Sequence, residues 1–188
     1  MTSPEQPLRI RSRGAPVTVN GRTLPLRAED LQQILPHRNG MALIDRVTEV
    51  EPGRRAAGQR LIARNDPALQ GHFPGRPIVP GVLVIESLAQ LCGVVLWSAE
   101  VPAAAGLADD ASAQEDPGSA GLGVLAGVKR FRFHRLVVPG DVVSLEARLT
   151  VQVGGLSDFN VHARVDREAV AQGSIQIGFR RVPPAPSI

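Results

Sequence analysis

The apolar stretch from Gly81 to Ala99 restricts what this chain can fold into more than any other feature. It contains a single charged side chain, Glu86, and it is too long for one strand. Pro80 precedes it, at a position where the first turn of a helix tolerates proline. A helix that is apolar on nearly every side must be enclosed by other parts of the protein. The sequence therefore predicts a central buried helix from Pro80 to about Ala99.

The rest of the chain predicts the structure that encloses this helix. Val142–Val153 alternates apolar and polar residues, which is typical of a half-buried strand, and Gly154-Gly155 then turns the chain back. Other patterned segments are a short helix at Arg27–Leu35 and strands at Ala42–Val50, Arg54–Arg64, Gly123–Phe133, Phe159–Val165 and Ile175–Phe179. Because short turns join most of these strands, we expect an α+β fold in which an antiparallel sheet wraps around one long central helix.

The length of 188 residues suits one ordinary domain with a single core. Residues 1–27 are expected to form an N-terminal tail with a small hairpin, because Asn20-Gly21 favours a type I′ turn. A single domain is predicted at 28–182, and it contains a flexible acidic loop at 101–121. Residues 183–188 are expected to form a C-terminal tail.

Composition and charge exclude several classes of function. The formal net charge of +3 is far from the dense basic stripe of a nucleic-acid-binding protein. The single cysteine, Cys92, allows no disulfide within the chain, and the N-terminus lacks a secretory signal, so we expect a cytoplasmic protein. Glu86, Ser87 and Gln90 interrupt the apolar stretch, which argues against a membrane span. The histidines show no metal-ligand spacing, and no metal or cofactor is expected.

Three features near the start of the central helix predict a proton-transfer site. His72 lies in the loop Gly71–Gly75, and prolines in and after this loop restrict the path of the chain. Glu86 is a carboxyl group in an apolar helix, where burial can keep it neutral near pH 7, as a general acid requires. The first N–H groups of the helix, from Gly81 onward, can polarise a carbonyl oxygen. Taken singly, Glu86 could equally be a structural partner of an arginine, and His72 an ordinary loop residue.

The same residues carry a resemblance to a known family. The sequence HFPGRPIVPGVLVIE at 72–86, Leu-Pro-His-Arg at 35–38 and Val-Val-Pro-Gly-Asp at 137–141 resemble FabZ-type (3R)-hydroxyacyl-[acyl carrier protein] dehydratases. The motifs stand in the family's order between about Ala28 and Val182. The resemblance implies a hot-dog fold, in which an antiparallel sheet wraps around a long helix. It also implies a homodimer, often assembled as a trimer of dimers, with active sites at the subunit interface.

The resemblance further implies a role for each site residue. His72 would remove the C2 proton of a 3-hydroxyacyl thioester, and Glu86 of the other subunit would protonate the departing C3 hydroxyl group. The Gly81 amide would bind the thioester carbonyl, and Gln90 would help to hold the Glu86 carboxyl. A substrate carried by acyl carrier protein or coenzyme A would contact Phe73, Pro80, Val82, Gln90, Val124 and Leu125.

The chain departs from the family pattern near these motifs, and one departure is Leu136, which stands where a proline usually precedes the Val-Val-Pro-Gly-Asp turn. Val124-Leu125 replaces a frequent aromatic pair, and Asn39-Gly40-Met41 follows the Pro-His-Arg motif in place of the usual Tyr-Pro-Phe. These differences leave open the acyl chain length and the choice between primary and secondary metabolism. His37 and Arg38 fit either the rim of the pocket or a structural loop.

Four basic residues between positions 129 and 135 form a cluster in the sequence. The cluster fits either a docking surface for an acidic carrier protein or a solvated strand end. Its members are Lys129, Arg130, Arg132 and Arg135. A hot-dog thioesterase and a non-catalytic module that binds acyl thioesters share the expected fold and are the alternative functions.

Overall fold

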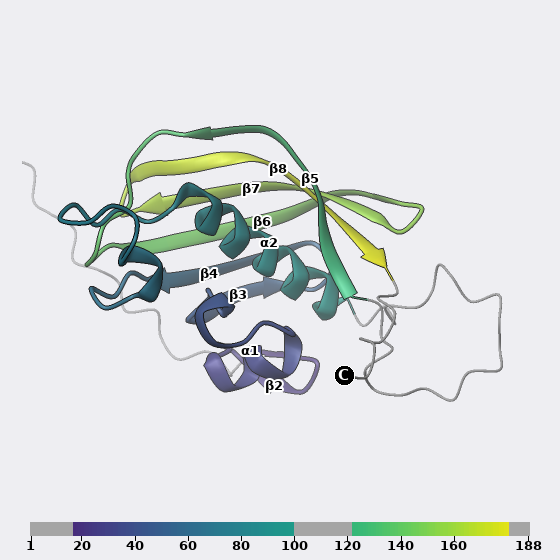
Figure 1. Ribbon diagram of the computed structural model, residues 1–188. Helices are drawn as coiled ribbons and strands as arrows, with labels where there is room; N and C mark the ends of the chain where they lie inside the picture. The colour runs from purple at the N-terminus through teal and green to yellow at the C-terminus, as the bar shows by residue number, and fades with distance from the viewer. Residues whose placement is uncertain (1–16, 100–121, 181–188) are drawn as a thin grey trace, which may run out of the picture.

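The computed structural model describes residues 17–99 and 122–180 (Figure 1). The elements are β1 (Thr18–Val19), β2 (Arg22–Thr23), α1 (Ala28–Ile34), a 3₁₀ turn at Asn39–Met41, β3 (Arg46–Glu51), β4 (Arg55–Leu61), a 3₁₀ turn at Pro67–Leu69, α2 (Gly81–Ser98), β5 (Leu122–Phe133), β6 (Val142–Val153), β7 (Leu156–Val165) and β8 (Glu168–Arg180). The acidic loop 101–121, the C-terminal tail 183–188 and most of the N-terminal tail lie outside the described residues.

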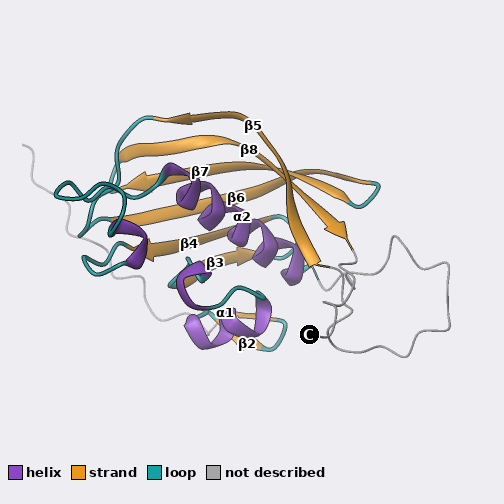
Figure 2. Ribbon diagram, in the orientation of Figure 1, coloured by secondary structure: helices purple, strands orange, loops and turns teal. Residues whose placement is uncertain are grey.

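The long helix α2 confirms the central helix that the apolar stretch predicts. It lies across one face of the sheet, which curves around it (Figure 2). Leu88 and Leu91 are fully buried, as is Cys92, and burial raises the pKa of the Cys92 thiol. By length and composition α2 could cross a membrane, but 61% of it is buried inside the described part of the protein. A helix enclosed in a core passes the same test, so this length carries no membrane assignment.

The sheet is antiparallel throughout, with six strands in the order β3-β4-β6-β7-β8-β5. Its register places the apolar residues of neighbouring strands on the same face, toward α2. For example, buried Leu145 of β6 lies opposite buried Ala163 of β7. The alternation predicted for Val142–Val153 is therefore confirmed as a strand. Near its end, Val151 and Val153 are exposed because the β6–β7 hairpin extends past α2 (Figure 1).

The N-terminal hairpin, which the sequence assigns to a tail at residues 1–27, packs against the domain expected at 28–182. Asn20 and Gly21 have φ angles of 48° and 75°, as a type I′ turn requires. Leu26 is fully buried and exchanges two backbone hydrogen bonds with Val47 of β3. The Asn20 side chain donates to the Trp97 carbonyl at 2.9 Å, which joins the hairpin to the end of α2.

The structure corrects two predicted strands, which are Arg46–Glu51 and Arg55–Leu61 instead of Ala42–Val50 and Arg54–Arg64. The consecutive residues Leu43 and Ile44 are both buried, so the chain before β3 does not alternate. The Leu43 N–H donates to the Gln90 side chain of α2 at 3.0 Å instead of to a neighbouring strand. This segment is therefore a connection that packs against α2, close to the predicted site.

Candidate active site

His72 lies on a loop that bonds to itself. Its backbone carbonyl accepts the Ile78 N–H at 3.0 Å, and its ring Nδ1 lies 2.9 Å from the Ile78 carbonyl oxygen. Because a carbonyl oxygen can only accept, Nδ1 carries the hydrogen and Nε2 keeps its lone pair in the neutral ring. Phe73 stacks on the ring with 4.2 Å between the ring centroids. His72 is therefore held in the tautomer that a general base acting through Nε2 requires.

Two connections fix this loop relative to the sheet and to α2. The Val79 N–H donates to the carbonyl of Val137, in the Val-Val-Pro-Gly-Asp motif, at 2.9 Å. Arg60 of β4 is 4% exposed and donates to Asp66, just before the loop, at 3.1 Å. The same guanidinium donates to Ser87 Oγ of α2 at 3.2 Å. The buried arginine thus joins β4, the His72 loop and the helix that carries Glu86.

Glu86 projects from the second turn of α2, where neighbouring side chains hold one of its two oxygens. Glu86 Oε1 accepts from Gln90 Nε2 at 2.9 Å and lies 3.3 Å from His37 Nε2. Gln90 is itself fixed, since its Nε2 donates to the Met41 carbonyl at 2.7 Å and its Oε1 accepts the Leu43 N–H. Among the residues whose side chains the structure describes, no arginine pairs with Glu86. An arginine pair is therefore not what holds this carboxyl in the described part of the chain.

Gly81 is the first residue of α2 and packs against Phe133 at the end of β5. A Cβ at this position would lie 2.9 Å from Phe133 Cζ, so a larger residue would displace the ring. The Leu83 N–H of the first turn donates to the Pro80 carbonyl at 2.9 Å, whereas the N–H groups of Gly81 and Val82 have no acceptor within the helix and lie at the positive end of its dipole. At this turn Pro80 is half-buried and Val82 exposes 69% of its surface, and in the His72 loop Phe73 exposes 55%. The start of α2 therefore offers N–H donors next to accessible apolar side chains.

The remaining predicted site residues do not meet within one chain. Val124, half-buried, and Leu125, exposed, lie toward the start of β5, whereas Phe133 and the start of α2 lie at its other end. From Val124 to Phe133 the strand advances nine steps, roughly 30 Å at the usual rise. His72 and Glu86 likewise share no hydrogen bond or ion pair in the described ranges. One chain thus presents separate parts of the site.

The basic cluster contains one half-buried residue, Arg135, and three exposed ones, of which Lys129 lies 3.7 Å from Asp158 in an ion pair. Arg135 donates to both carboxylate oxygens of Asp141, at 2.8 and 3.1 Å, and pairs with Glu168 at 2.9 Å. Burial by itself would raise the pKa of Asp141, but the hydrogen bonds it accepts, chiefly from Arg135, hold that pKa below its ordinary value. Arg135 thus stabilises the Val-Val-Pro-Gly-Asp turn. The exposed members on β5 are Lys129, Arg130 and Arg132.

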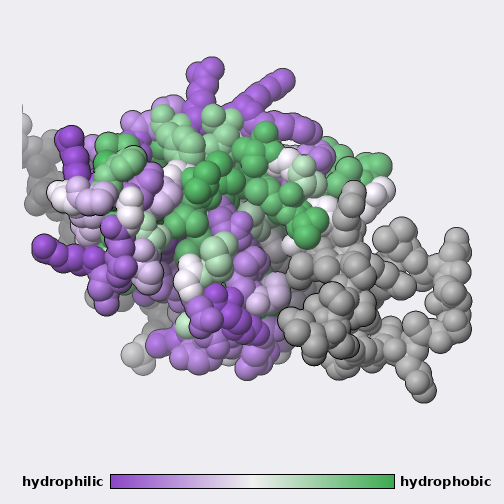
Figure 3. All heavy atoms as spheres, viewed as in Figure 1, coloured by the Kyte–Doolittle hydropathy of each residue, from purple (hydrophilic) through white to green (hydrophobic). Residues whose placement is uncertain are grey.

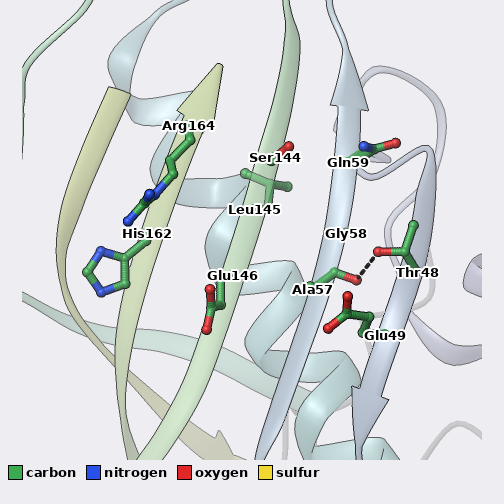
Figure 4. A pocket seen from close by; sticks show the side chains of 10 residues that line it. All are labelled: Thr48, Glu49, Ala57, Gly58, Gln59, Ser144, Leu145, Glu146, His162 and Arg164. Carbon is green, nitrogen blue, oxygen red and sulfur yellow. Dashed lines mark hydrogen bonds between the residues drawn. The ribbon is translucent and has the colours of Figure 1, made fainter. Parts of the chain in front are cut away.

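A hollow of about 210 Å³ lies on the outer face of the sheet, away from the residues above (Figure 4). Its lining includes Glu146, His162 and Arg164, and it contains neither His72 nor Glu86. Glu146 is paired with Arg55 at 2.7 Å. Across residues 17–99 and 122–180, no three His, Cys, Asp or Glu side chains cluster so that they could hold a metal ion. This hollow is therefore separate from the candidate site that contains His72 and Glu86.

Comparisons with known proteins identify the family. The model of the FabA-like domain matches residues 35–174. A relative from Acetivibrio thermocellus, named 3-hydroxyacyl-[acyl-carrier-protein] dehydratase FabZ, is 42% identical over 150 residues, which are 80% of this chain and 92% of that protein. The chain belongs to the FabZ dehydratase family. A FabZ of the same name from Clostridioides difficile (strain 630) is 36% identical over 154 residues, covering 82% of this chain and 97% of the relative.

Solved structures give the same fold for this FabZ family member. The dehydratase heterocomplex ApeI:P from Xenorhabdus doucetiae superposes with a TM-score of 0.63 at 24% identity, over 85% of this chain and 93% of that one. Cj0977, a sigma28-regulated virulence protein from Campylobacter jejuni, superposes with a TM-score of 0.52 at 15% identity, over 81% and 92%. At these identities the likeness concerns the fold alone. The α+β hot-dog fold expected from the sequence is thereby confirmed.

One contact of the candidate site has no signal in the sequence. The sequence allows His37 either at the pocket rim or in a structural loop, and the structure places its Nε2 beside Glu86 Oε1. The Leu-Pro-His-Arg motif marks the segment, but no spacing in the sequence links positions 37 and 86. Only the packing of the connection after α1 against α2 brings the two side chains together.

Proposed function

We propose that this chain is a cofactor-free dehydratase that converts a (3R)-hydroxyacyl thioester into a trans-2-enoyl thioester, in fatty acid biosynthesis or a related lipid or polyketide pathway. Its FabZ relatives are named for dehydration of a 3-hydroxyacyl group on acyl carrier protein. The observation that carries the proposal for the site is the His72 tautomer. The bonded Nδ1–H leaves Nε2 free to accept a proton from substrate.

In the proposed reaction, His72 Nε2 removes a proton from C2 of the bound substrate. The negative charge passes to the thioester oxygen, and the N–H groups at the Gly81 end of α2 stabilise the resulting enolate. The C3–O bond then breaks, Glu86 gives its proton to the departing oxygen, and water leaves as the C2–C3 double bond forms. Return of a proton from His72 to Glu86 restores the starting state.

We further propose that the working unit is a dimer joined along β5. This strand is at the edge of the sheet, so one side of it lacks a partner strand among the described elements. Leu125, Val128 and Phe133 on β5 are 43%, 40% and 49% exposed, and Figure 3 shows apolar side chains gathered over α2 and β5. Two β5 strands paired antiparallel about Val128 would place Val124 opposite the partner's Arg132. This pairing would bring the separated parts of the site together.

The variant Val128→Arg is expected to prevent this pairing and to abolish dehydration. Val128 lies opposite Ile175, which is fully buried on the α2 side, so an arginine there would introduce an unpaired charge into the proposed interface. Size-exclusion chromatography with light scattering should give a monomer, whereas the unmodified protein should be a dimer or a larger assembly. Val151→Arg, at an exposed position on β6, is the matched control. A dimeric and active Val128→Arg protein would contradict the proposal.

Carrier binding and assembly extend the same proposal. Lys129, Arg130 and Arg132 would form a docking surface for an acidic acyl carrier protein, because opposite charges speed and orient the encounter. Arg135 would support this surface through its ion pairs with the turn. We propose a cytoplasmic protein, and a trimer of dimers as one form in which the dimers assemble.

Ultraviolet absorbance of the purified protein with 3-hydroxybutyryl and 3-hydroxydecanoyl pantetheine thioesters tests the function directly. We expect the absorbance of a conjugated enoyl thioester to rise with time and no free thiol to appear. The preferred chain length would then narrow the pathway. Release of free thiol would instead indicate a thioesterase. Tight binding without turnover would indicate a module that only binds acyl thioesters.

A further inference from the structure

His37 occupies a position beside the Glu86 carboxyl that the reaction above does not explain. Its Nε2 lies 3.3 Å from Glu86 Oε1, the same oxygen that accepts from Gln90. We propose that His37 is a positioning residue that donates its Nε2–H to Oε1, and that Oε2 is therefore the oxygen that gives the proton to the leaving hydroxyl group. The inference rests on the proposed function of Glu86 as the acid.

The orientation of the Gln90 amide shows that Oε1 acts as an acceptor. Gln90 Oε1 accepts the Leu43 N–H at 3.0 Å, so the nitrogen of the amide must be the atom near Met41 and Glu86. One Nε2 hydrogen goes to the Met41 carbonyl at 2.7 Å, and the other goes to Glu86 Oε1 at 2.9 Å. Since a carboxyl oxygen has two lone pairs, Oε1 can also accept from His37. A proton on Glu86 is thereby directed to Oε2.

The surroundings of the other ring nitrogen identify the tautomer of His37. Its Nδ1 is buried and has no hydrogen-bond partner among the described residues. A buried N–H without an acceptor costs free energy, and an imidazolium would carry that N–H together with a charge. The neutral ring with its hydrogen on Nε2 avoids this cost and places the hydrogen next to Glu86 Oε1. His37 is therefore a donor in the state that the geometry favours.

The segment that carries His37 is held in place independently of Glu86. Arg38 donates to the carbonyls of Leu35 and His37 at 2.7 and 2.8 Å, which closes the turn after α1. Leu35 packs on α2 at Gly93, where a Cβ would lie only 3.2 Å from Leu35 Cδ2. This close approach seats the turn against the helix. A donor on a fixed turn can hold the Glu86 side chain in one rotamer, which acid catalysis requires.

Kinetics of paired variants separate a donor role from a packing role. His37→Phe keeps a planar ring but removes the donor, and we expect kcat for enoyl formation to fall about 10- to 100-fold with KM nearly unchanged. His37→Gln places an amide N–H near the position of Nε2 and should recover kcat to within about fivefold of the unmodified protein. His162→Gln, on the outer face of the sheet, is the matched control. Unchanged kcat in His37→Phe, or equal losses in both variants, would overturn the proposal.

A second measurement does not depend on turnover. The chain has four histidines, so nitrogen-15 labelling of histidine gives a simple spectrum in which the His37→Gln variant assigns the His37 signals. We expect His37 to show the neutral ring with hydrogen on Nε2 at neutral pH, and an Nδ1–H tautomer or an imidazolium would overturn the proposal. If the unmodified protein forms no enoyl product, the proposed function fails, while this spectrum still decides the His37 contact. If enoyl forms and the spectrum differs, only the His37 inference fails.

Discussion

A mixture of two inactive subunits, His72→Ala and Glu86→Gln, is expected to regain dehydratase activity when the two chains form mixed dimers. Each variant alone should lose roughly 10²- to 10⁴-fold in kcat, because each removes a proton-transfer group. In a mixed dimer with shared sites, one site contains both altered residues and the other contains intact His72 and intact Glu86. The measurement is kcat for enoyl formation by dimers purified through a different affinity tag on each subunit.

The physical reason for this recovery is the separation of the site residues within one chain. The His72 ring bonds to Ile78 and stacks on Phe73, and Glu86 bonds to Gln90, without a hydrogen bond or ion pair between His72 and Glu86 in the described ranges. If each site instead lies within one chain, mixing the variants restores nothing. The control pairs Glu86→Gln with a chain that carries both substitutions, which leaves no intact site in any dimer. Recovery in that control would contradict the shared site.

Gly173→Ala is expected to be the most destabilising small substitution in the sheet. Gly173 of β8 lies under Phe131, and an added Cβ would be 2.6 Å from Phe131 Cδ2 and 2.8 Å from Phe131 Cα. The second contact is with backbone, so a change of side-chain rotamer cannot relieve it. We expect the free energy of unfolding to fall by about 2–3 kcal/mol, as for overpacked cores. Urea denaturation at one fixed protein concentration measures the change.

A neighbouring glycine provides the matched control for this prediction. At Gly127 of β5 an added Cβ would lie 3.6 Å from the Gln176 side chain, which is an ordinary contact. Gly127→Ala should therefore leave the free energy of unfolding nearly unchanged. Equal stabilities of the Gly173→Ala and Gly127→Ala proteins would show that β5 can move away from β8. The irregular register between Lys129 and Arg132 would then be flexible and not a fixed bulge.

The parts of the fold that the sequence predicted well are those with a strong local pattern. The apolar stretch predicted the bounds of α2 nearly as observed, because a long apolar run without polar alternation is compatible with little except an enclosed helix. The alternation of Val142–Val153 correctly predicted β6, and Asn20-Gly21 correctly predicted the hairpin turn. The strand predicted from Ala42 was too long, because Leu43 bonds to a side chain of α2 and not to a neighbouring strand.

For the site, the sequence supplied the residues but not their surroundings. The motif that contains His72 and Glu86 occupies consecutive residues, so it can be identified from the sequence alone. The tautomer of His72 could not be read in this way, since it depends on how the loop folds back to the Ile78 carbonyl. The ion pairs of Arg135 with Asp141 and of Lys129 with Asp158 could not be read from the sequence either, because each depends on how the chain folds between the two residues.

The sequence by itself determined the α+β class, the enclosed helix and the family motifs, because periodicity and short motifs involve residues that are close along the chain. Only the tertiary structure decided which side chains touch across that fold. Position 37 meets position 86, Gly81 meets Phe133, and Gly173 meets Phe131, each through packing of separate elements. Contacts between positions that are distant along the chain produce no periodic pattern in the sequence. The side chains beside Glu86 can therefore be identified only from the folded structure, in which other segments pack around α2.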